Sequence, residues 1–490
     1  MGWWHWKKRC HQLEAENRRL QERNAWLEGR LAEVQAQNRQ LVQSLAAAKK
    51  NSTTSSKPPS SDIVKAPKPS RSSSPRSIGG QRGHPRHERV AFPPDQVDER
   101  QFHGLNQCPE CGSRDLETLP EPAQVFQQVE LLPKPFKVTE HVVQACRCRN
   151  CQAVGTGQLP EAVARTGLVG PRLMGLLLFM KGALRTSYSA LQEFLDHVLG
   201  FKVSRGYLAK VMVRGSQALE APVQQLQSLL PVQRVLNVDE TSHKENGTLM
   251  WTWCFRASQF VLFSIQLSRG SEVLIEFLGL EFAGVLGCDY FSAYRKFMGT
   301  MTGLVQFCLA HLIRDLKFLA EHPDPGMPLY AQPILRAIRR MFRLIHEQVA
   351  QPRDDFQRRL ERHKQRIIAL AVDTSPLSPI QWYVQEHYPE VFNLAERFRK
   401  HGKEYFTFIT TPGVDPTNNA AEQILRFVVM DRRATQGTRS ANGRTFCERI
   451  WTVVGTSRIN QRSIFQYLYE AVHAWAEGRP IPSLLPSDSS

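Results

Sequence analysis

Apolar residues recur every seven positions near the N-terminus, which predicts one long helix over residues 10–48. One series consists of Leu13, Leu20, Leu27, Val34 and Leu41. A second series lies four positions later and consists of Asn17, Asn24, Leu31, Asn38 and Leu45. Three asparagines in the second series favour a parallel two-stranded coiled coil, at a cost in stability. A single amphipathic helix packed on a domain is the alternative for residues 1–50.

The pattern then disappears over residues 51–98, where Ser, Pro, Lys and Arg dominate. Aliphatic residues are too sparse there to offset the entropy of ordering, so this segment is predicted to be a disordered basic linker. Residues 51–90 hold eight Lys or Arg and two acidic residues, a net +6. The last residues, 481–490, are interpreted as a tail.

Helical periodicity returns over residues 161–230 and predicts a helical domain. Within it, Tyr188–Leu199, a stop at Gly200, and a helix capped by Ser204 that runs to Val213 resemble a helix-turn-helix. Two packed helices joined by glycine are common, so DNA reading and simple packing are equally favoured here.

The period changes again at residue 232, where short apolar runs predict strands. They are Val235–Asp239, Thr248–Phe255, Val261–Gln266, Val285–Asp289 and Leu304–Cys308, with a hairpin around Ala257-Ser258. Charged helical sequence fills 326–400, and further helices begin after Thr417 and around Gln461–Ala476. We therefore expect a multidomain α/β protein whose α/β domain is split into residues 231–320 and 411–480 by a helical insertion, residues 321–410.

Length and charge narrow the function classes. A chain of 490 residues predicts three or four domains, and 63 Lys and Arg against 46 Asp and Glu give +17, which favours a polyanionic partner. The most apolar run, Leu173–Met180, is too short to span a membrane. With no signal-peptide pattern either, we expect a cytoplasmic protein whose ten cysteines are thiols or metal ligands.

Cysteine pairs in residues 99–160 predict a zinc ribbon with one structural Zn²⁺. Cys108 and Cys111 form one Cys-x-x-Cys pair, and Cys148 and Cys151 form the other. A strand-like stretch, Phe136–Val143, lies between the pairs. Cys146 could replace Cys148 as the fourth ligand.

Three carboxylates stand out by their positions. Asp239 and Asp289 each end a predicted strand, and Glu422 lies near the start of a helix that Thr417 is expected to cap. Such acids can hold two Mg²⁺ or Mn²⁺ ions for phosphodiester chemistry. Glu448 is a rival third acid, and Glu240 is expected on the opposite strand face from Asp239.

The chain resembles the insertion-sequence sixty-six family of DDE transposases in an ordered set of motifs. Around the carboxylates these are Val238-Asp239-Glu240-Thr241, Asp289-Tyr290-Phe291-Ser292-Ala293-Tyr294, Cys308-Leu309-Ala310-His311-Leu312-Ile313-Arg314 and Pro416-Thr417-Asn418-Asn419-Ala420-Ala421-Glu422. Nearer the N-terminus they are the heptad helix, Ser55-Ser56-Lys57-Pro58-Pro59-Ser60-Ser61-Asp62, Gly80-Gln81-Arg82-Gly83-His84 and the cysteine pairs.

The resemblance implies an RNase H-like catalytic core in which Asp239, Asp289 and Glu422 bind the metals. It also implies cleavage at transposon ends followed by strand transfer. Two segments depart from the family pattern. Gln423 follows Glu422 where the family often has Arg, and Asp431-Arg432-Arg433-Ala434 replaces a segment resembling Gly-Arg-Lys-Asn. These changes put a DNA contact near residues 423–434 in doubt.

Arginines after Glu422 predict DNA contacts. Residues 423–465 contain eight arginines and two acids, a net +6. Arg426 falls one helical turn after Glu422, and arginine's planar fork suits phosphate. The nucleic-acid contacts expected are His311, Arg314, Arg426, Arg432 and Arg433. Cys308 and His311 could instead be zinc ligands, but no second pair of such residues is near them in sequence.

The leading hypothesis is a bacterial, nucleoid-associated DNA transposase that cleaves insertion-sequence ends and joins the 3′-hydroxyl to target DNA. Its expected partners are double-stranded DNA, a second copy of the chain paired through residues 1–50, and accessory proteins of the same element. A catalytically silent DNA-binding derivative is the alternative, and a nuclease without strand transfer is a third possibility.

Overall fold

The structure, a computed structural model, describes the chain in several ranges. They are residues 2–49, 91–101, 106, 109–115, 127–129, 131–132, 134–147, 149–152, 154–346 and 353–486. The chain forms two compact units, Ala66–Val142 and a larger unit of Met1–Lys65 with Val143–Ser490. Most of the predicted basic linker, together with Cys108 and Cys148, falls outside the described residues. In the smaller unit, η2 (Pro94–Gln96) is a 3₁₀ helix, and the Gln127 side chain pairs with the backbone of Phe92.

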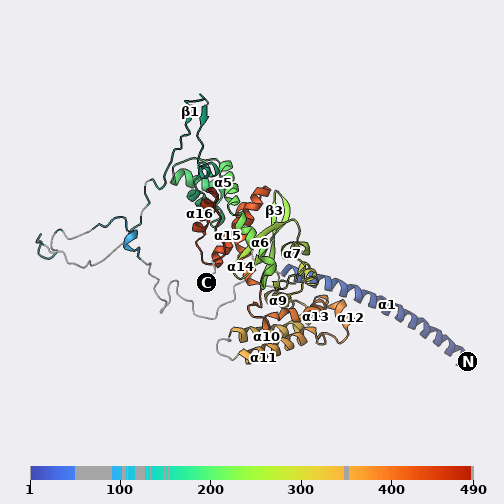
Figure 1. Cartoon of the computed structure of the whole chain (residues 1–490). Helices are drawn as coiled ribbons and strands as arrows, with labels where there is room; N and C mark the ends of the chain where they lie inside the picture. Colours follow the sequence, from blue (N-terminus) through green and yellow to red (C-terminus); the bar gives the residue numbers. More distant parts are fainter. Residues whose placement is uncertain are drawn as a thin grey trace. The chain divides into compact units, whose positions relative to one another are not determined.

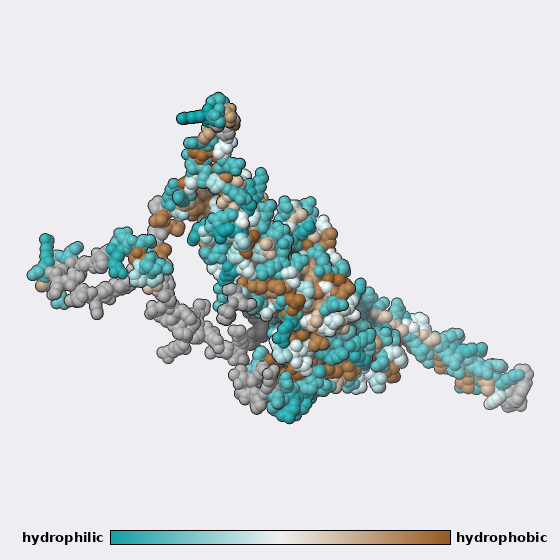
Figure 2. Space-filling model, viewed as in Figure 1, coloured by the Kyte–Doolittle hydropathy of each residue, from teal (hydrophilic) through white to brown (hydrophobic). Residues whose placement is uncertain are grey.

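The predicted N-terminal helix is present as α1 (Gly2–Lys49). Its heptad residues remain at the surface, where Leu13 keeps 51% and Leu41 keeps 69% of its area exposed. Hydrophobic residues interrupt an otherwise hydrophilic surface along this helix (Figure 2). Pairing of α1 with a second copy stays a prediction.

The strand predicted at Phe136–Val143 is wrong. These residues form no strand, and Val138 and Val142 are exposed without a partner strand among the described residues. The structure instead pairs β1 (Ala145–Arg147) antiparallel with β2 (Val154–Thr156). The short ladder therefore begins where the second cysteine cluster begins, rather than between the two clusters.

The predicted helical region is confirmed as helical. Its elements are α2 (Glu161–Thr166), α3 (Pro171–Gly182), α4 (Tyr188–Glu193), the π-helical turn η3 (Phe194–Val198), α5 (Arg205–Gln217), α6 (Glu220–Ser228) and the 3₁₀ turn η4 (Leu230–Val232). As predicted, Ser204 caps α5 by accepting a hydrogen bond from the Tyr207 N–H. Within the described chain, Glu161–Gly182 is apolar and long enough to cross a membrane. Packed core helices meet the same criterion, and a break at Gly167 divides this stretch into α2 and α3.

All five strands predicted after residue 232 are present in one mixed sheet. They are β3 (Val235–Glu245), β4 (Thr248–Arg256), β5 (Val261–Gln266), β6 (Val285–Cys288) and β7 (Leu304–Phe307), in the spatial order β5-β4-β3-β6-β7. The first three form an antiparallel meander, and β6 and β7 run parallel to β3. The two parallel strands follow helical crossovers, as such connections require.

Helices cover the sheet and fill the insertion. Between the strands lie α7 (Ser271–Leu278) and α8 (Ser292–Met298), followed after β7 by α9 (Leu309–Ala320). The insertion contains α10 (Gly326–His346), α11 (Arg353–Val372), α12 (Gln381–His387), α13 (Pro389–His401) and the 3₁₀ turns η6 (Lys403–Tyr405) and η7 (Thr407–Ile409). The chain ends in α14 (Asn419–Thr435), α15 (Ala441–Ile459) and α16 (Ile464–Ala476). Figure 1 shows α10 to α13 gathered in one group apart from α14 to α16.

Helix α15 protects the edge strand β5. Thr456, Thr452 and Glu448 accept hydrogen bonds from the N–H groups of Val261, Phe263 and Ile265, in that order. Four residues of helix rise about 6 Å and two residues of strand rise about 6.6 Å, so the two repeats match. The exposed N–H groups of an edge strand are thereby satisfied by side chains.

Candidate active site

Strand register places Asp239 and Asp289 next to each other. β3 and β6 pair in parallel up to Asn237 and Gly287, and each aspartate lies two residues beyond its paired residue. Two residues is one full period of a strand, so both side chains leave the same face of the sheet. Asp239 does not end its strand as predicted. β3 continues to Glu245 because its antiparallel pairing with β4 outlasts its pairing with β6.

Asn418 positions the helix that carries Glu422. Its side chain donates to the Val238 carbonyl at 2.8 Å and accepts from Asn237 Nδ2 at 2.9 Å. Its backbone N–H donates to the Cys308 sulfur at 3.1 Å. Gly287 permits this arrangement, because a Cβ at that position would lie 2.4 Å from Asn237 Nδ2.

The predicted capping role of Thr417 is wrong. The residue before α14 is Asn418, and the Thr417 hydroxyl donates instead to Asp415 Oδ1 at 2.6 Å. The helix begins one residue later than a Thr417 cap would place it, with Glu422 in its first turn. The Asn418 side chain makes tertiary contacts in place of a local cap.

The three acids interact electrostatically. Burial raises the pKa of Asp239 well above its usual range, and the charges of Glu240, Asp289 and Glu422 raise it further. Burial and the charge of Glu240 also raise the pKa of Asp289. Carboxylates gathered in this way favour protons or cations, because each disfavours ionisation of the next.

Basic groups from α9 face Glu422. Arg314 Nη2 lies 3.1 Å from Glu422 Oε2, and His311 Nδ1 lies 3.6 Å from Oε1. The buried His311 Nδ1 has no hydrogen-bond partner in the described part of the chain. Burial lowers the pKa of His311, against the opposing charge of Glu422, so the ring is favoured in its neutral form.

Cys308, His311 and Glu422 form a possible metal-binding group. Their ligand atoms all lie within 4.8 Å of one another. No partner for Cys308 and His311 is near them in sequence, and the structure brings Glu422 to them from more than 100 residues away. Burial raises the pKa of the Cys308 thiol to about 11, and its sulfur accepts the Asn418 N–H. A protonated, hydrogen-bonded thiol is a poor metal ligand.

Glu240 lies on the other strand face from Asp239, as predicted, in a network that the sequence did not reveal. Its buried carboxylate pairs with Arg269 at 2.7 Å and accepts a hydrogen bond from the Tyr294 hydroxyl. The Arg269 guanidinium stacks over Phe291, 3.9 Å from the ring centre. The charge of Arg269 also lowers the pKa of Asp289. The network around Glu240 therefore influences the ionisation of one of the three candidate acids.

The arginines predicted to contact DNA take different positions. Arg426 and Arg433 are exposed on α14. Arg432 donates to the Thr241 hydroxyl at 3.2 Å, two residues along β3 from Asp239 and on the same strand face. Arg314 pairs with Glu422, as described above.

Glu448, the rival third acid, lies elsewhere. Its carboxylate accepts the Ile265 N–H at 2.6 Å on edge strand β5, two strands away from β3. Burial raises its pKa to about 7. This contact gives Glu448 a structural role in attaching α15 to the sheet.

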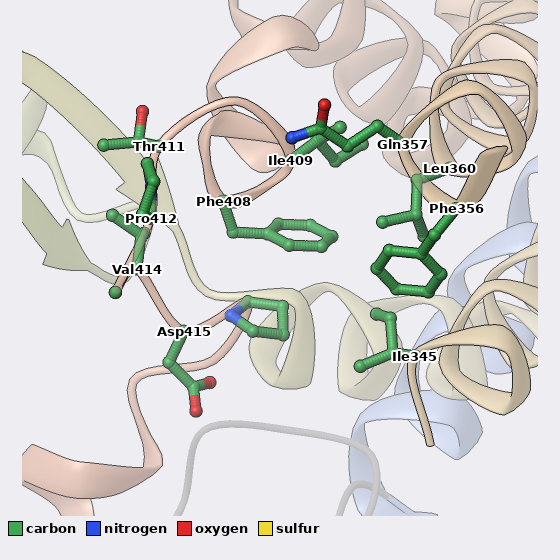
Figure 3. A pocket seen from close by; sticks show the side chains of 12 residues that line it. Ile345, Phe356, Gln357, Leu360, Phe408, Ile409, Thr411, Pro412, Val414 and Asp415 are labelled. Atoms are coloured by element: carbon green, nitrogen blue, oxygen red, sulfur yellow. The ribbon is translucent and has the colours of Figure 1, made fainter. Parts of the chain in front are cut away.

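A cavity of about 710 Å³ lies between the insertion and the loop before α14. Figure 3 shows the rings of Phe356 and Phe408 facing its interior, with Asp415 at one side. None of the three acids lines it. The cavity is therefore separate from the carboxylate cluster.

The predicted zinc ligands are described only in part. Cys111 and Cys151 are free and exposed, and so is the alternative ligand Cys146. Cys108 and Cys148 lie outside the described residues.

The fold and the site together define a mixed α/β protein, mostly helical, with acidic side chains gathered where β3 and β6 stop pairing. The chain belongs to the transposase IS66 family, whose model matches residues 166–445, more than half of its length. The zinc-finger binding domain of transposase IS66 matches residues 106–152, and a family of unknown function (DUF6444) matches residues 7–90. Family membership identifies a DNA-processing enzyme with DNA as its partner, and the zinc-finger match indicates a zinc site.

The chain is also similar to "Uncharacterized protein y4hP" of Sinorhizobium fredii (strain NBRC 101917 / NGR234). The two are 24% identical over 392 residues, which cover 72% of this chain and 67% of the relative.

Proposed function

We propose that this protein is a DNA transposase that cleaves insertion-sequence ends and joins the freed 3′-hydroxyl to target DNA by DDE chemistry. The proposal rests mainly on the proximity of Asp239, Asp289 and Glu422. The charges of Asp289 and Glu422 contribute to the raised pKa of Asp239. Membership of the transposase IS66 family supports the same reaction class.

Asp239, Asp289 and Glu422 would hold two Mg²⁺ or Mn²⁺ ions. The donor set fits, because hard carboxylate oxygens suit these ions. Burial raises the pKa values of Asp239 and Asp289, and neighbouring negative charges, which cations would offset, raise them further. When bound, two such ions activate the attacking oxygen and stabilise the leaving oxygen of a phosphodiester. Arg314 and His311 lie next to the Glu422 carboxylate and would orient it.

The catalytic core is inferred to be RNase H-like. A three-stranded antiparallel meander followed by two strands parallel to its first member supports this assignment. Helices α10 to α13 would form the insertion between Asp289 and Glu422, dividing the core into residues 231–320 and 411–480.

The remaining parts are assigned to DNA binding and assembly. Residues 99–160 would form a ribbon around one structural Zn²⁺ held by Cys108, Cys111, Cys148 and Cys151, with Cys146 the alternative to Cys148. Four protein ligands leave no open position, so this zinc would be structural. The exposed leucines of α1 would pair two protomers. His311, Arg314, Arg426, Arg432 and Arg433 would contact the DNA near the cleavage site.

The test is cleavage of DNA by the purified chain. With Mg²⁺ and a duplex that contains an element end, the wild type should nick the strand and produce joined product. Asp239→Asn should abolish both while DNA binding persists, and Asp354→Asn, at an exposed position on α11, should behave as wild type. Cleavage by the Asp239→Asn variant would contradict the proposal. Nicking without joined product would identify a nuclease, and DNA binding without nicking by the wild type would identify the silent derivative.

A further inference from the structure

Two arginines that are far apart in sequence meet over one aromatic ring. Arg185 lies in the loop between α3 and α4, and Arg458 lies in the last turn of α15. Their guanidinium carbons are 5.5 and 4.6 Å from the centre of the Phe427 ring on α14. Because Phe427 is buried, it forms a fixed surface on which both guanidinium groups rest.

These two cations lack a carboxylate partner among the described residues. The Arg185 side chain donates to the sulfur of Met430 at 4.0 Å, and within the described ranges Arg458 forms no ion pair. Withdrawal from water and then the charge of Arg185 lower the pKa of Arg458, so the two groups repel each other. Two like charges held together in this way favour an anion between them.

The buried Asp431 does not supply the anion that Arg185 and Arg458 favour. Its carboxylate accepts a hydrogen bond from Trp451 Nε1 at 2.8 Å, and burial raises its pKa. The positive charges of Lys181 and Arg185 lower the pKa of Asp431. Cations therefore outnumber acids around this carboxylate.

The backbone holds Arg185 in place in advance of binding. Its φ is +61°, in the left-handed region that non-glycine residues rarely occupy. Hydrogen bonds from the Ala183 N–H to the Phe179 carbonyl and from the Thr186 N–H to the Met180 carbonyl fix the loop on both sides of it. This left-handed residue ends α3 in a common helix-terminating geometry, which fixes the backbone position of Arg185.

We propose that Arg185 and Arg458 together bind one backbone phosphate of duplex DNA. The inference rests on the proposed function in taking DNA as the ligand. Planar guanidinium groups match the oxygens of a phosphodiester, and two of them from different elements can hold one phosphate from two sides. Because Phe427 lies five residues after Glu422 on α14, this contact would fix the duplex to the helix that carries the third acid.

The experiment measures binding of two duplexes of unrelated sequence, by fluorescence anisotropy of the full chain at several NaCl concentrations, in buffer with no chelator and no added Mg²⁺ or Mn²⁺. Arg185→Gln and Arg458→Gln should each weaken binding about tenfold and equally on both duplexes. The slope of log K against log salt is negative, and each substitution should reduce its magnitude by about 1. The double variant should reduce the magnitude no further. Arg479→Gln is the matched control, because Arg479 is already paired with Glu477 at 2.5 Å.

An unchanged slope in a double variant that melts at the wild-type temperature would overturn the proposal. If the double variant reduces the magnitude of the slope by about 2, each arginine contacts a phosphate of its own, and the proposal of one shared phosphate is wrong. If the glutamine variants fail to fold, Arg185→Lys and Arg458→Lys should keep the slope and lose affinity, and unaltered affinity in both would count against the site. Binding is measured without added Mg²⁺ or Mn²⁺, so these results are independent of the Asp239→Asn cleavage test of the proposed function.

Discussion

The amide of Asn418 donates a hydrogen bond to the backbone carbonyl of Val238 at 2.8 Å, one residue before Asp239. The same side chain accepts from Asn237, and its N–H reaches Cys308. One buried asparagine thus connects the central strand, the start of α9 and the start of α14. The distance between Glu422 and the two aspartates depends on this residue.

Replacing Asn418 should damage both stability and cleavage. Asn418→Ala leaves the Val238 carbonyl and the Asn237 amide without partners, which should cost about 1–3 kcal/mol in urea unfolding. A displacement of about 1 Å at Glu422 should slow cleavage about 100-fold. Asn419→Ala, at the exposed neighbouring residue, should change neither quantity. Wild-type cleavage by Asn418→Ala would show that it does not position Glu422.

Stability without metal should fall as the pH rises. The folded pKa of Asp239 lies above 3.8, its ordinary value, so between these values the folded state binds more protons than the unfolded state. Without added Mg²⁺ or Mn²⁺, and with no chelator present, Asp239→Asn should therefore gain stability over the wild type as the pH rises from 5 to 8. Mg²⁺ should raise the melting temperature of the wild type and leave that of Asp239→Asn nearly unchanged. A variant less stable than the wild type at every pH would contradict this.

The pair of Arg269 and Glu240 should behave as a buried ion pair. Arg269→Met leaves the Glu240 carboxylate, 1% exposed, without its cation. The cost should be about 3 kcal/mol, the lower end for such pairs, because Arg269 itself is 36% exposed. Adding Glu240→Gln should recover most of this loss, as a double-mutant cycle in urea would measure. Additive losses would show that the pair does not interact.

Loss of Arg269 should also affect the metal site. Its positive charge lowers the pKa of Asp289 and repels other cations from that carboxylate, so Arg269→Met should lower the Mg²⁺ concentration needed for half-maximal cleavage. An unchanged requirement for Mg²⁺ would remove this functional role from the network.

Zinc content should follow the predicted ligands. Atomic absorption should find one zinc per chain, and Cys111→Ser and Cys151→Ser should each abolish it. Cys10→Ser, on α1, should retain the metal. Comparing Cys146→Ser with Cys148→Ser identifies the fourth ligand, and zinc retained in Cys111→Ser would refute the predicted set.

Local patterns were sufficient for most of the sheet. The apolar run Val261–Gln266 coincides with β5, in which every residue except Gln266 is buried. Asp239 was misplaced at a strand end, because the extension of β3 depends on β4 and the sequence Thr241–Glu245 is polar. The strand predicted at Phe136–Val143 had suitable composition but finds no neighbouring strand in the part of the chain that the structure describes.

The three candidate acids could be selected from the sequence, but the residues that contact and position them could not. Asp289 and Glu422 occupy element ends that sequence can recognise. Asn418, in contrast, contacts residues 110 and 180 positions away, and Arg269 reaches Glu240 across a strand, so neither contact leaves a local periodic signal. Gln423 and the segment 431–434, which depart from the family pattern, leave the three acids in place.

The most direct measurement of the central claim is anomalous X-ray scattering from crystals of the full chain soaked in Mn²⁺. The account predicts two manganese peaks about 3.5–4 Å apart, both ligated by the carboxylates of Asp239, Asp289 and Glu422. Peaks confined to Cys308 and His311, or no peak at this cluster at saturating Mn²⁺, would contradict it.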